Sequence, residues 1–142
     1  MKTSIEIKIR SYHMDQFNHV NNARYLEFIE EAGWTYAEQN NLLAHYHSLG
    51  IFHVIANINI DYIHSAHSGD VLRIESDLHG RSDASITMNH QIFNTSSGRL
   101  ITEAKVTSVY LDQTTNAVVP VDRRFFSFWP DLLKLGKGTS NG

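Results

Sequence analysis

The chain contains no cysteine, and this absence excludes several kinds of chemistry. Without thiols there is no disulfide, no thiolate nucleophile, no cysteine-ligated zinc and no iron–sulfur cluster. The sequence also has no apolar run long enough to cross a bilayer. Near the start, Ile5, Ile7 and Ile9 alternate with charged residues, a pattern typical of a half-exposed strand and not of a signal peptide. We therefore expect a cytoplasmic protein without a membrane span.

An excess of basic charge is missing as well. Lys and Arg together number 12 against 15 Asp and Glu, which gives a formal net charge of -3 at pH 7. A nucleic-acid-binding protein needs a basic face, so we expect no nucleic-acid partner. The sequence also lacks the Gly-x-Ser-x-Gly elbow of serine hydrolases, the Gly-x-Gly-x-x-Gly dinucleotide fingerprint and the Gly-Lys-Ser/Thr of phosphate-binding loops.

The chain is rich in histidine, with nine residues, but their spacing does not favour a metal site. His64 and His67 fall in a predicted turn with no evident carboxylate partner. His13 and His19 flank Asp15, which is the arrangement that comes nearest to an oxygen–nitrogen site. We expect no metal and no organic cofactor.

The length and the spacing of apolar residues predict one α+β domain. The chain has 142 residues, which is enough for a single domain. We assign residues 1–135 to that domain and expect the small, polar residues 136–142 to form a flexible tail. Periodicity predicts a strand, a long helix, a short helix and four further strands, in that order, over residues 3–10, 23–39, 42–49, 51–63, 72–78, 86–92 and 99–112. Short connections imply antiparallel neighbours, so the simplest packing curls the sheet around the long helix.

The most informative segment is the loop that leads into the long helix. It places the carboxylate of Asp15 shortly before a helix start marked by Asn21 and Asn22. The first N–H groups of a helix have no partner within it, and they favour negative charge, including charge that develops on a carbonyl oxygen. An acid or base beside such a helix end suits acyl transfer. In the alternative interpretation, Asp15 and the two asparagines only bind loop amides and cap the helix.

The same segment resembles a known family. Asp15-x-x-Asn18-His19-Val-Asn21-Asn22-x-x-Tyr25 is similar to the motif of the hotdog-fold acyl-CoA thioesterases of the 4-hydroxybenzoyl-CoA thioesterase-like group. The likeness continues in Asn59-Ile60-Asp61-Tyr62, in Ser68-Gly69-Asp70-Val71-Leu72 and in the long final strand, and it covers about residues 3–120. It implies a hotdog fold, in which an antiparallel sheet wraps one long central helix.

The resemblance also implies an activity and catalytic roles. The chain would hydrolyse an acyl-CoA thioester to a carboxylic acid and CoA. Asp15 matches the acidic residue that attacks the thioester carbonyl or activates water, and the backbone N–H of Asn22 would polarise that carbonyl. His19 would support the loop or position water, or act only as a structural hydrogen-bonding residue. Attack through an anhydride and general-base attack by water both remain open.

Candidate substrate-binding residues follow from the same resemblance. Asn18 stands where the family commonly has glycine; asparagine would tolerate a positive φ there, and its bulkier side chain would narrow the entrance for the acyl group. Tyr25 is a candidate ligand or a core residue, and Arg81, in the predicted turn 79–83, is a candidate contact for the CoA phosphates or a solvated turn residue. Asn57 and Asn59, on the polar face of their strand, are expected to reach the site of a neighbouring subunit.

The resemblance implies a homodimer or homotetramer with sites between subunits. Two other functions compete with acyl-CoA hydrolysis on this fold. One is hydrolysis of acyl–carrier-protein thioesters, which a basic pocket mouth would favour, and the other is non-catalytic acyl binding. A hotdog dehydratase needs a catalytic histidine with an acidic partner on the helix, and the sequence has no convincing match.

Overall fold

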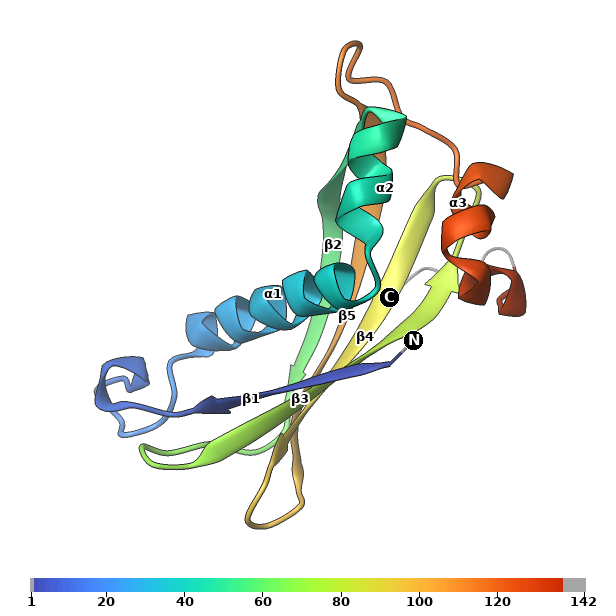
Figure 1. The fold of residues 1–142 in the computed structure, drawn as a ribbon. Helices are drawn as coiled ribbons and strands as arrows, with labels where there is room; N and C mark the ends of the chain where they lie inside the picture. Colours follow the sequence, from blue (N-terminus) through green and yellow to red (C-terminus); the bar gives the residue numbers. More distant parts are fainter. Residues whose placement is uncertain (1, 137–142) are drawn as a thin grey trace.

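A five-stranded antiparallel sheet with one long helix across its inner face forms the body of the protein in the computed structural model, which describes residues 2–136 (Figure 1). The strands are β1 (Thr3–Lys8), β2 (Ile51–Tyr62), β3 (Val71–Arg81), β4 (Ser85–Asn94) and β5 (Leu100–Asp112). The helices are α1 (Asn22–Gln39), α2 (Leu42–Leu49) and α3 (Arg123–Phe128), with 3-10 turns η1 (Ser11–His13) and η2 (Pro130–Lys134). The predicted α+β architecture is confirmed, whereas the predicted tail, apart from Gly136, lies outside the described residues.

The strand order in the sheet is β1-β3-β4-β5-β2, and each of the four pairings is antiparallel. The turns between β3, β4 and β5 are short, which keeps these three strands adjacent in the centre. β3 continues through a bulge between Leu78 and Gly80 as far as Arg81. The turn predicted at 79–83 is therefore wrong in position, because a bulge lets the strand pass a glycine without ending.

The helix α1 begins where the two asparagines predict. The side chain of Asn21 accepts a hydrogen bond from the Ala23 N–H at 2.9 Å and caps the helix. Its buried face packs against β1 and β3. The buried residues are Tyr25, Phe28, Ile29, Ala32, Tyr36 and Ala37. Leu26 and Trp34 are 40% and 44% exposed and lie on the flank of α1 that faces β2.

Two segments after β5 were not predicted. They are α3 and η2, which fold over one end of the sheet beside the end of β3 (Figure 1). Phe125, Trp129 and Leu132 from this region are fully buried and pack with α2 and the second half of α1. The inner face of the sheet therefore has two apolar clusters, one under each half of α1.

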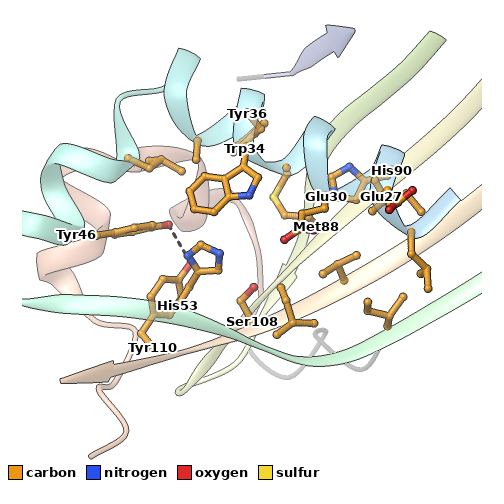
Figure 2. Close-up of a pocket in the computed structure, with 18 of the residues that line it drawn as sticks. Glu27, Glu30, Trp34, Tyr36, Tyr46, His53, Met88, His90, Ser108 and Tyr110 are labelled. Carbon is orange, nitrogen blue, oxygen red and sulfur yellow. Dashed lines mark hydrogen bonds between the residues drawn. The ribbon is translucent and has the colours of Figure 1, made fainter. Parts of the chain in front are cut away.

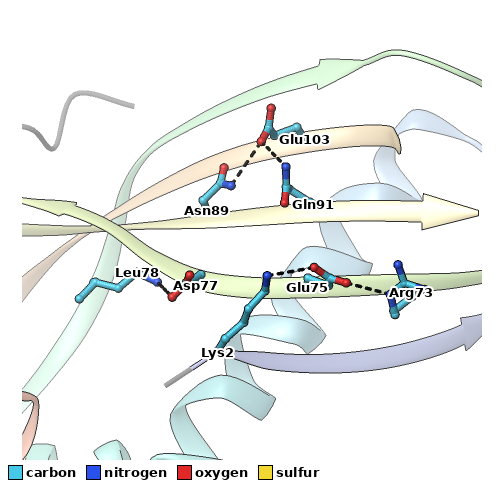
Figure 3. A network of polar contacts seen from close by, with 8 residues as sticks. All are labelled: Lys2, Arg73, Glu75, Asp77, Leu78, Asn89, Gln91 and Glu103. Atoms are coloured by element: carbon cyan, nitrogen blue, oxygen red, sulfur yellow. Dashed lines mark hydrogen bonds and ion pairs between the residues drawn. The ribbon is translucent and has the colours of Figure 1, made fainter. Parts of the chain in front are cut away.

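The outer face of the sheet is polar (Figure 3). Glu75 accepts from Arg73 Nε at 2.9 Å and pairs with Lys2 Nζ at 3.2 Å. On the next strands, Glu103 accepts from Gln91 Nε2 at 3.0 Å and from Asn89 Nδ2 at 3.3 Å. A polar outer face can stay in contact with water, so α1 packs on the other, apolar face of the sheet. None of the helices within residues 2–136 combines the length and hydrophobicity that a membrane crossing requires.

Candidate active site

The loop before α1 is a closed turn whose two ends are pinned together. Met14 and Val20 form an antiparallel bridge, and the Asn21 N–H donates to the His13 carbonyl at 2.9 Å. The Val20 N–H donates to the Ala66 carbonyl at 3.1 Å, which attaches the turn to the segment after β2. Residues paired in this way have Cα atoms about 4.5–5.5 Å apart. Asp15 is therefore held next to the start of α1.

The carboxylate of Asp15 is half-buried and uses one oxygen to shape this turn. Its Oδ1 accepts from the Phe17 N–H at 2.8 Å and from the His19 N–H at 3.3 Å. The backbone closes the same turn, because the Asp15 N–H donates to the His19 carbonyl at 2.8 Å. Within residues 2–136, Oδ2 of Asp15 has no hydrogen-bond partner. Oδ1 therefore binds loop amides, as the alternative interpretation of Asp15 predicted, whereas Oδ2 is available to take part in a reaction.

The first residue of α1 offers the expected backbone donor. Asn21 is the cap, so Asn22 occupies the first helical position, where intrahelical partners are lacking. Over the part of the chain that the structure describes, the Asn22 N–H has no acceptor. Its carbonyl accepts from the Tyr62 hydroxyl at 3.2 Å, which fixes the end of β2 beside the start of α1. Within residues 2–136, Asp15 thus has a carboxylate oxygen without a hydrogen-bond partner, and Asn22, at the end of the same loop, has a backbone N–H without an acceptor.

His19 and Asn18 complete the turn through their backbones. Asn18 has a φ of 66°, a left-handed conformation that asparagine tolerates better than most residues. The imidazole of His19 is exposed and packs edge-on against that of His67, with ring centroids 5.4 Å apart. His67 does have a carboxylate neighbour, contrary to the sequence-based expectation, because Asp70 Oδ2 lies 3.9 Å from the imidazole Nδ1 of His67 and accepts from its backbone N–H at 2.9 Å. The histidine and carboxylate meet because a tight turn follows β2.

Tyr25 lies in the core, as one of its two interpretations predicted. It is buried against Phe28 and Tyr62, and its hydroxyl bonds to the backbone of Ala66. Burial raises the pKa of this phenol, so it stays protonated. The backbone of Ala66 thus binds both the Tyr25 hydroxyl and the N–H of Val20, at the end of the loop. This arrangement favours a role for Tyr25 in positioning the loop over contact with substrate.

Arg81 does not lie on an exposed turn, which corrects both interpretations made from the sequence. It is buried, its Nε donates to the Leu132 carbonyl at 2.7 Å, and its guanidinium lies 4.9 Å from the centre of the Phe126 ring. The unpredicted C-terminal helices cover this end of β3 and enclose the side chain. Asn57 and Asn59, in contrast, are exposed on the edge strand β2, as predicted.

A cavity of about 330 Å³ lies between α1 and the strands β2, β4 and β5 (Figure 2). Its volume is within the range typical of small-molecule sites. Along α1 its lining runs from Leu26 to Ala37, a length of about 16 Å at ~1.5 Å per residue. Leu26 is one helical turn beyond Asn22. None of the site residues predicted from the sequence lines this cavity, although its lining begins one helical turn beyond Asn22.

The two ends of the cavity differ in their polar groups. Figure 2 shows Glu27 and His90 toward one end, and Tyr46, His53 and Tyr110 together at the other. The Tyr46 and Tyr110 hydroxyls are hydrogen-bonded to each other at 3.0 Å. Burial raises the pKa of both phenols and lowers that of His53, so all three groups are neutral near pH 7.

His90 lines the cavity wall from β4. Its Nδ1 is hydrogen-bonded to the Ser76 hydroxyl at 2.8 Å, and burial lowers its pKa to about 4. Sequence reasoning missed these cavity residues, but a signal was present. Ser76 and His90 interrupt the apolar faces of two predicted strands, and their cross-strand pairing places them together. Within residues 2–136, no three acidic or histidine side chains gather in a way that could hold a metal ion.

Comparison with known proteins places this geometry in context. The sequence profile of the Thioesterase-like superfamily matches residues 9–133. The chain is 36% identical over 117 residues to the long-chain acyl-CoA thioesterase FadM of Escherichia coli (strain K12), covering 82% of this chain and 89% of that protein. It is 29% identical over 109 residues to the chloroplastic acyl-acyl carrier protein thioesterase ATL3 of Arabidopsis thaliana, covering 76% of this chain and 57% of that protein.

A solved structure agrees with these matches. The probable thioesterase YbaW of Escherichia coli superposes with a TM-score of 0.83 at 32% identity, covering 93% of this chain and 98% of that one. This likeness confirms the predicted hotdog fold.

Proposed function

The chain belongs to the Thioesterase-like superfamily and is a thioester hydrolase, and we propose that its substrate is an acyl-CoA, which it converts to a carboxylic acid and free CoA. One observation carries this proposal: the same loop presents a carboxylate oxygen of Asp15 and a backbone N–H of Asn22, and neither has a hydrogen-bond partner within residues 2–136. Similarity to FadM, an acyl-CoA thioesterase, supports CoA as the thiol.

In the proposed reaction, the thioester carbonyl lies between these two groups. The Asn22 N–H donates to the carbonyl oxygen, and such a backbone donor is typically worth ~2.7–4 kcal/mol in the transition state. Asp15 Oδ2 either takes a proton from a water that attacks the carbonyl carbon or attacks that carbon itself. In the first case, breaking the C–S bond gives the carboxylic acid directly; in the second, it leaves an anhydride between the acyl group and Asp15, which a water then hydrolyses to the carboxylic acid and the free Asp15 carboxylate. In both cases the thiolate of CoA leaves without a strong general acid, because a thiol has a pKa of about 8.5.

The acyl group would enter the cavity along α1. Leu26 lies about 6 Å beyond Asn22 along the helix axis, so a chain whose carbonyl is at Asn22 can continue directly into the cavity. The walls there are mainly apolar, and a length of about 16 Å suits a medium or long acyl chain. Asn18 and His19, exposed at the outer side of the turn, would border the entrance.

We also propose that the active form is a homo-oligomer built on β2. This strand has 12 residues and lies at the end of the sheet, so one of its edges has no neighbouring strand within residues 2–136. Val54, Ile55 and Ile58 are exposed on it. A long apolar edge is a template for pairing with another chain, and a second β2 is the simplest match. Asn57 and Asn59 would then lie at the subunit interface, near the partner's loop.

Carrier-protein thioesters are the second candidate substrate, because ATL3 acts on acyl-acyl carrier protein. Carrier proteins are acidic, however, and the formal net charge of -3 does not favour their docking. Non-catalytic acyl binding is the third.

The direct test is a thiol-release assay on a panel of acyl-CoAs, with matched acyl–carrier proteins as competing substrates. We expect catalytic release of CoA, with the highest kcat/KM for medium or long chains. Preference for the carrier-protein thioester would favour the second candidate. Acyl-dependent thermal stabilisation without any thiol release would contradict the proposal and indicate a binding module.

A further inference from the structure

The end of the cavity far from Asp15 is not built like a simple hydrocarbon pocket. Tyr46 and Tyr110 are both almost fully buried, yet their hydroxyls and the His53 imidazole face this space (Figure 2). The His53 ring lies 6.2 Å from that of Tyr46 and 6.5 Å from that of Tyr110, measured between centroids. Three polar groups from α2, β2 and β5 therefore converge at one point.

These groups are not fully satisfied by one another. Two phenols have two O–H protons, and a single hydrogen bond at 3.0 Å between their oxygens uses only one of them. The second proton has no acceptor within residues 2–136, and over the same residues the His53 imidazole has no hydrogen-bond partner. The second phenol proton and the imidazole of the half-buried His53 are therefore available to hydrogen-bond an oxygen of a ligand that enters this end of the cavity.

A hydroxyl matches the unsatisfied groups best. It accepts one hydrogen bond and donates another, so it can accept from the free phenol proton while bonding to His53. A carboxylate would lack a cation here, because the charged residues that line the cavity are Glu27 and Glu30. A bare methyl end would leave the phenol and imidazole unpaired.

We propose that this enzyme prefers acyl groups that carry a hydroxyl at the end distant from the thioester, bound by the Tyr46–Tyr110 pair and His53. This inference rests on the proposed function, and it names the substrate class that the cavity selects. Discrimination of this kind is strong where a site is built to hydrogen-bond a hydroxyl, because the analogue without it leaves buried polar groups unpaired.

The test compares dodecanoyl-CoA with ω-hydroxydodecanoyl-CoA in the unmodified protein and in the double variant Tyr46→Phe/Tyr110→Phe. Replacing both members of a hydrogen-bonded pair by apolar groups of the same shape is nearly neutral for stability, so the variant is expected to fold. Tyr12→Phe, at an exposed position that does not line the cavity, is the matched control.

In the unmodified protein and in Tyr12→Phe, we expect a higher kcat/KM for the hydroxylated substrate. In the double variant, the ratio of the two kcat/KM values should fall by about fivefold or more. A ratio that is the same in the double variant and the unmodified protein would overturn the inference and leave the proposed function intact.

A binding measurement separates the two proposals further. Calorimetry with the free acids, ω-hydroxydodecanoic and dodecanoic acid, needs no hydrolysis. If neither CoA thioester is cleaved but the hydroxy acid binds more tightly only when both tyrosines are present, the proposed function fails and the cavity assignment stands. Equal affinity for the two acids in the unmodified protein would overturn the cavity assignment.

Discussion

Asp15 and His90 are polar side chains held in opposite ways. Asp15 lies at the surface of a tight turn, where two backbone N–H groups bind one of its oxygens and leave the other accessible. His90 is enclosed by the sheet and α1, with the Ser76 hydroxyl on one nitrogen. The first arrangement suits chemistry on a bound substrate. The second makes the folded state sensitive to protonation.

Burial of His90 predicts a loss of stability in acid. The pKa of His90 in the folded state, lowered to about 4, lies below the ordinary histidine value of 6.5, so the unfolded chain binds a proton at a pH where the folded chain does not. Stability is therefore complete above about pH 6.5 and declines as the pH falls from there toward about 4. Between about pH 7.5 and about pH 5, we expect His90 to remove about 2 kcal/mol from the free energy of unfolding.

Urea denaturation at the two pH values measures this loss. The variant His90→Gln should lose less stability on acidification by about the same 2 kcal/mol, whereas His79→Gln, at an exposed position, should behave like the unmodified protein. Equal pH dependence in all three proteins would show that His90 does not control it.

Arg81 supports the C-terminal helices, and its replacement should reduce stability without weakening substrate binding. Lysine keeps the charge but loses the planar contact with Phe126 and the fixed donor to the Leu132 carbonyl. We expect Arg81→Lys to lower the free energy of unfolding by about 1–3 kcal/mol and to leave KM for acyl-CoA unchanged. Arg99→Lys, on an exposed turn, is the control. A raised KM with unchanged stability would instead indicate a phosphate contact.

At the scale of elements, β2 differs from the other strands. Over much of their length, β3, β4 and β5 alternate buried with half-buried residues, as a sheet with one covered face should. β2 is exposed along most of its length and has a bulge between Ile55 and Asn57. A free apolar strand of this length is consistent with an intersubunit edge.

The proposed assembly predicts that a charge on this edge produces monomers. Light scattering during size exclusion should give the unmodified protein at least twice the chain mass of 16.2 kDa. Val54→Lys should shift the mass toward that of one chain, because assembly through β2 would then bury a charge in the apolar interface. Val118→Lys, at an exposed position outside β2, should not. A monomeric unmodified protein would contradict the assembly.

At the scale of the whole molecule, local patterns predicted the parts of the fold that carry their own periodicity. The alternation around Ile74 and Ile92 and the three-to-four spacing in α1 correspond to the observed strands and helix. α3 was missed because a six-residue helix is not stable alone and depends on burial of Phe125. Arg81 was misplaced for the same reason, since its environment is created by residues about 50 positions later.

The candidate site likewise has a part that local sequence patterns predict and a part that they do not. The loop of Asp15 is local in sequence, so the loop and the asparagine cap of α1 could be predicted. The cavity is assembled from α1, α2, β2, β4 and β5, and its polar end depends on which strand positions face inward at a distance. Such long-range convergence leaves only an indirect trace in one sequence, namely polar residues on an apolar strand face.

The most direct test of the central claim is the thioesterase rate of Asp15→Asn on dodecanoyl-CoA. Asparagine can still accept the Phe17 and His19 N–H groups, so the loop and the melting temperature should be preserved. Asp77→Asn is the matched control, because it also accepts a backbone N–H at an exposed position. We expect kcat to fall by at least about a hundredfold in Asp15→Asn and to stay unchanged in Asp77→Asn. A folded Asp15→Asn protein that releases CoA at the unmodified rate would contradict the account.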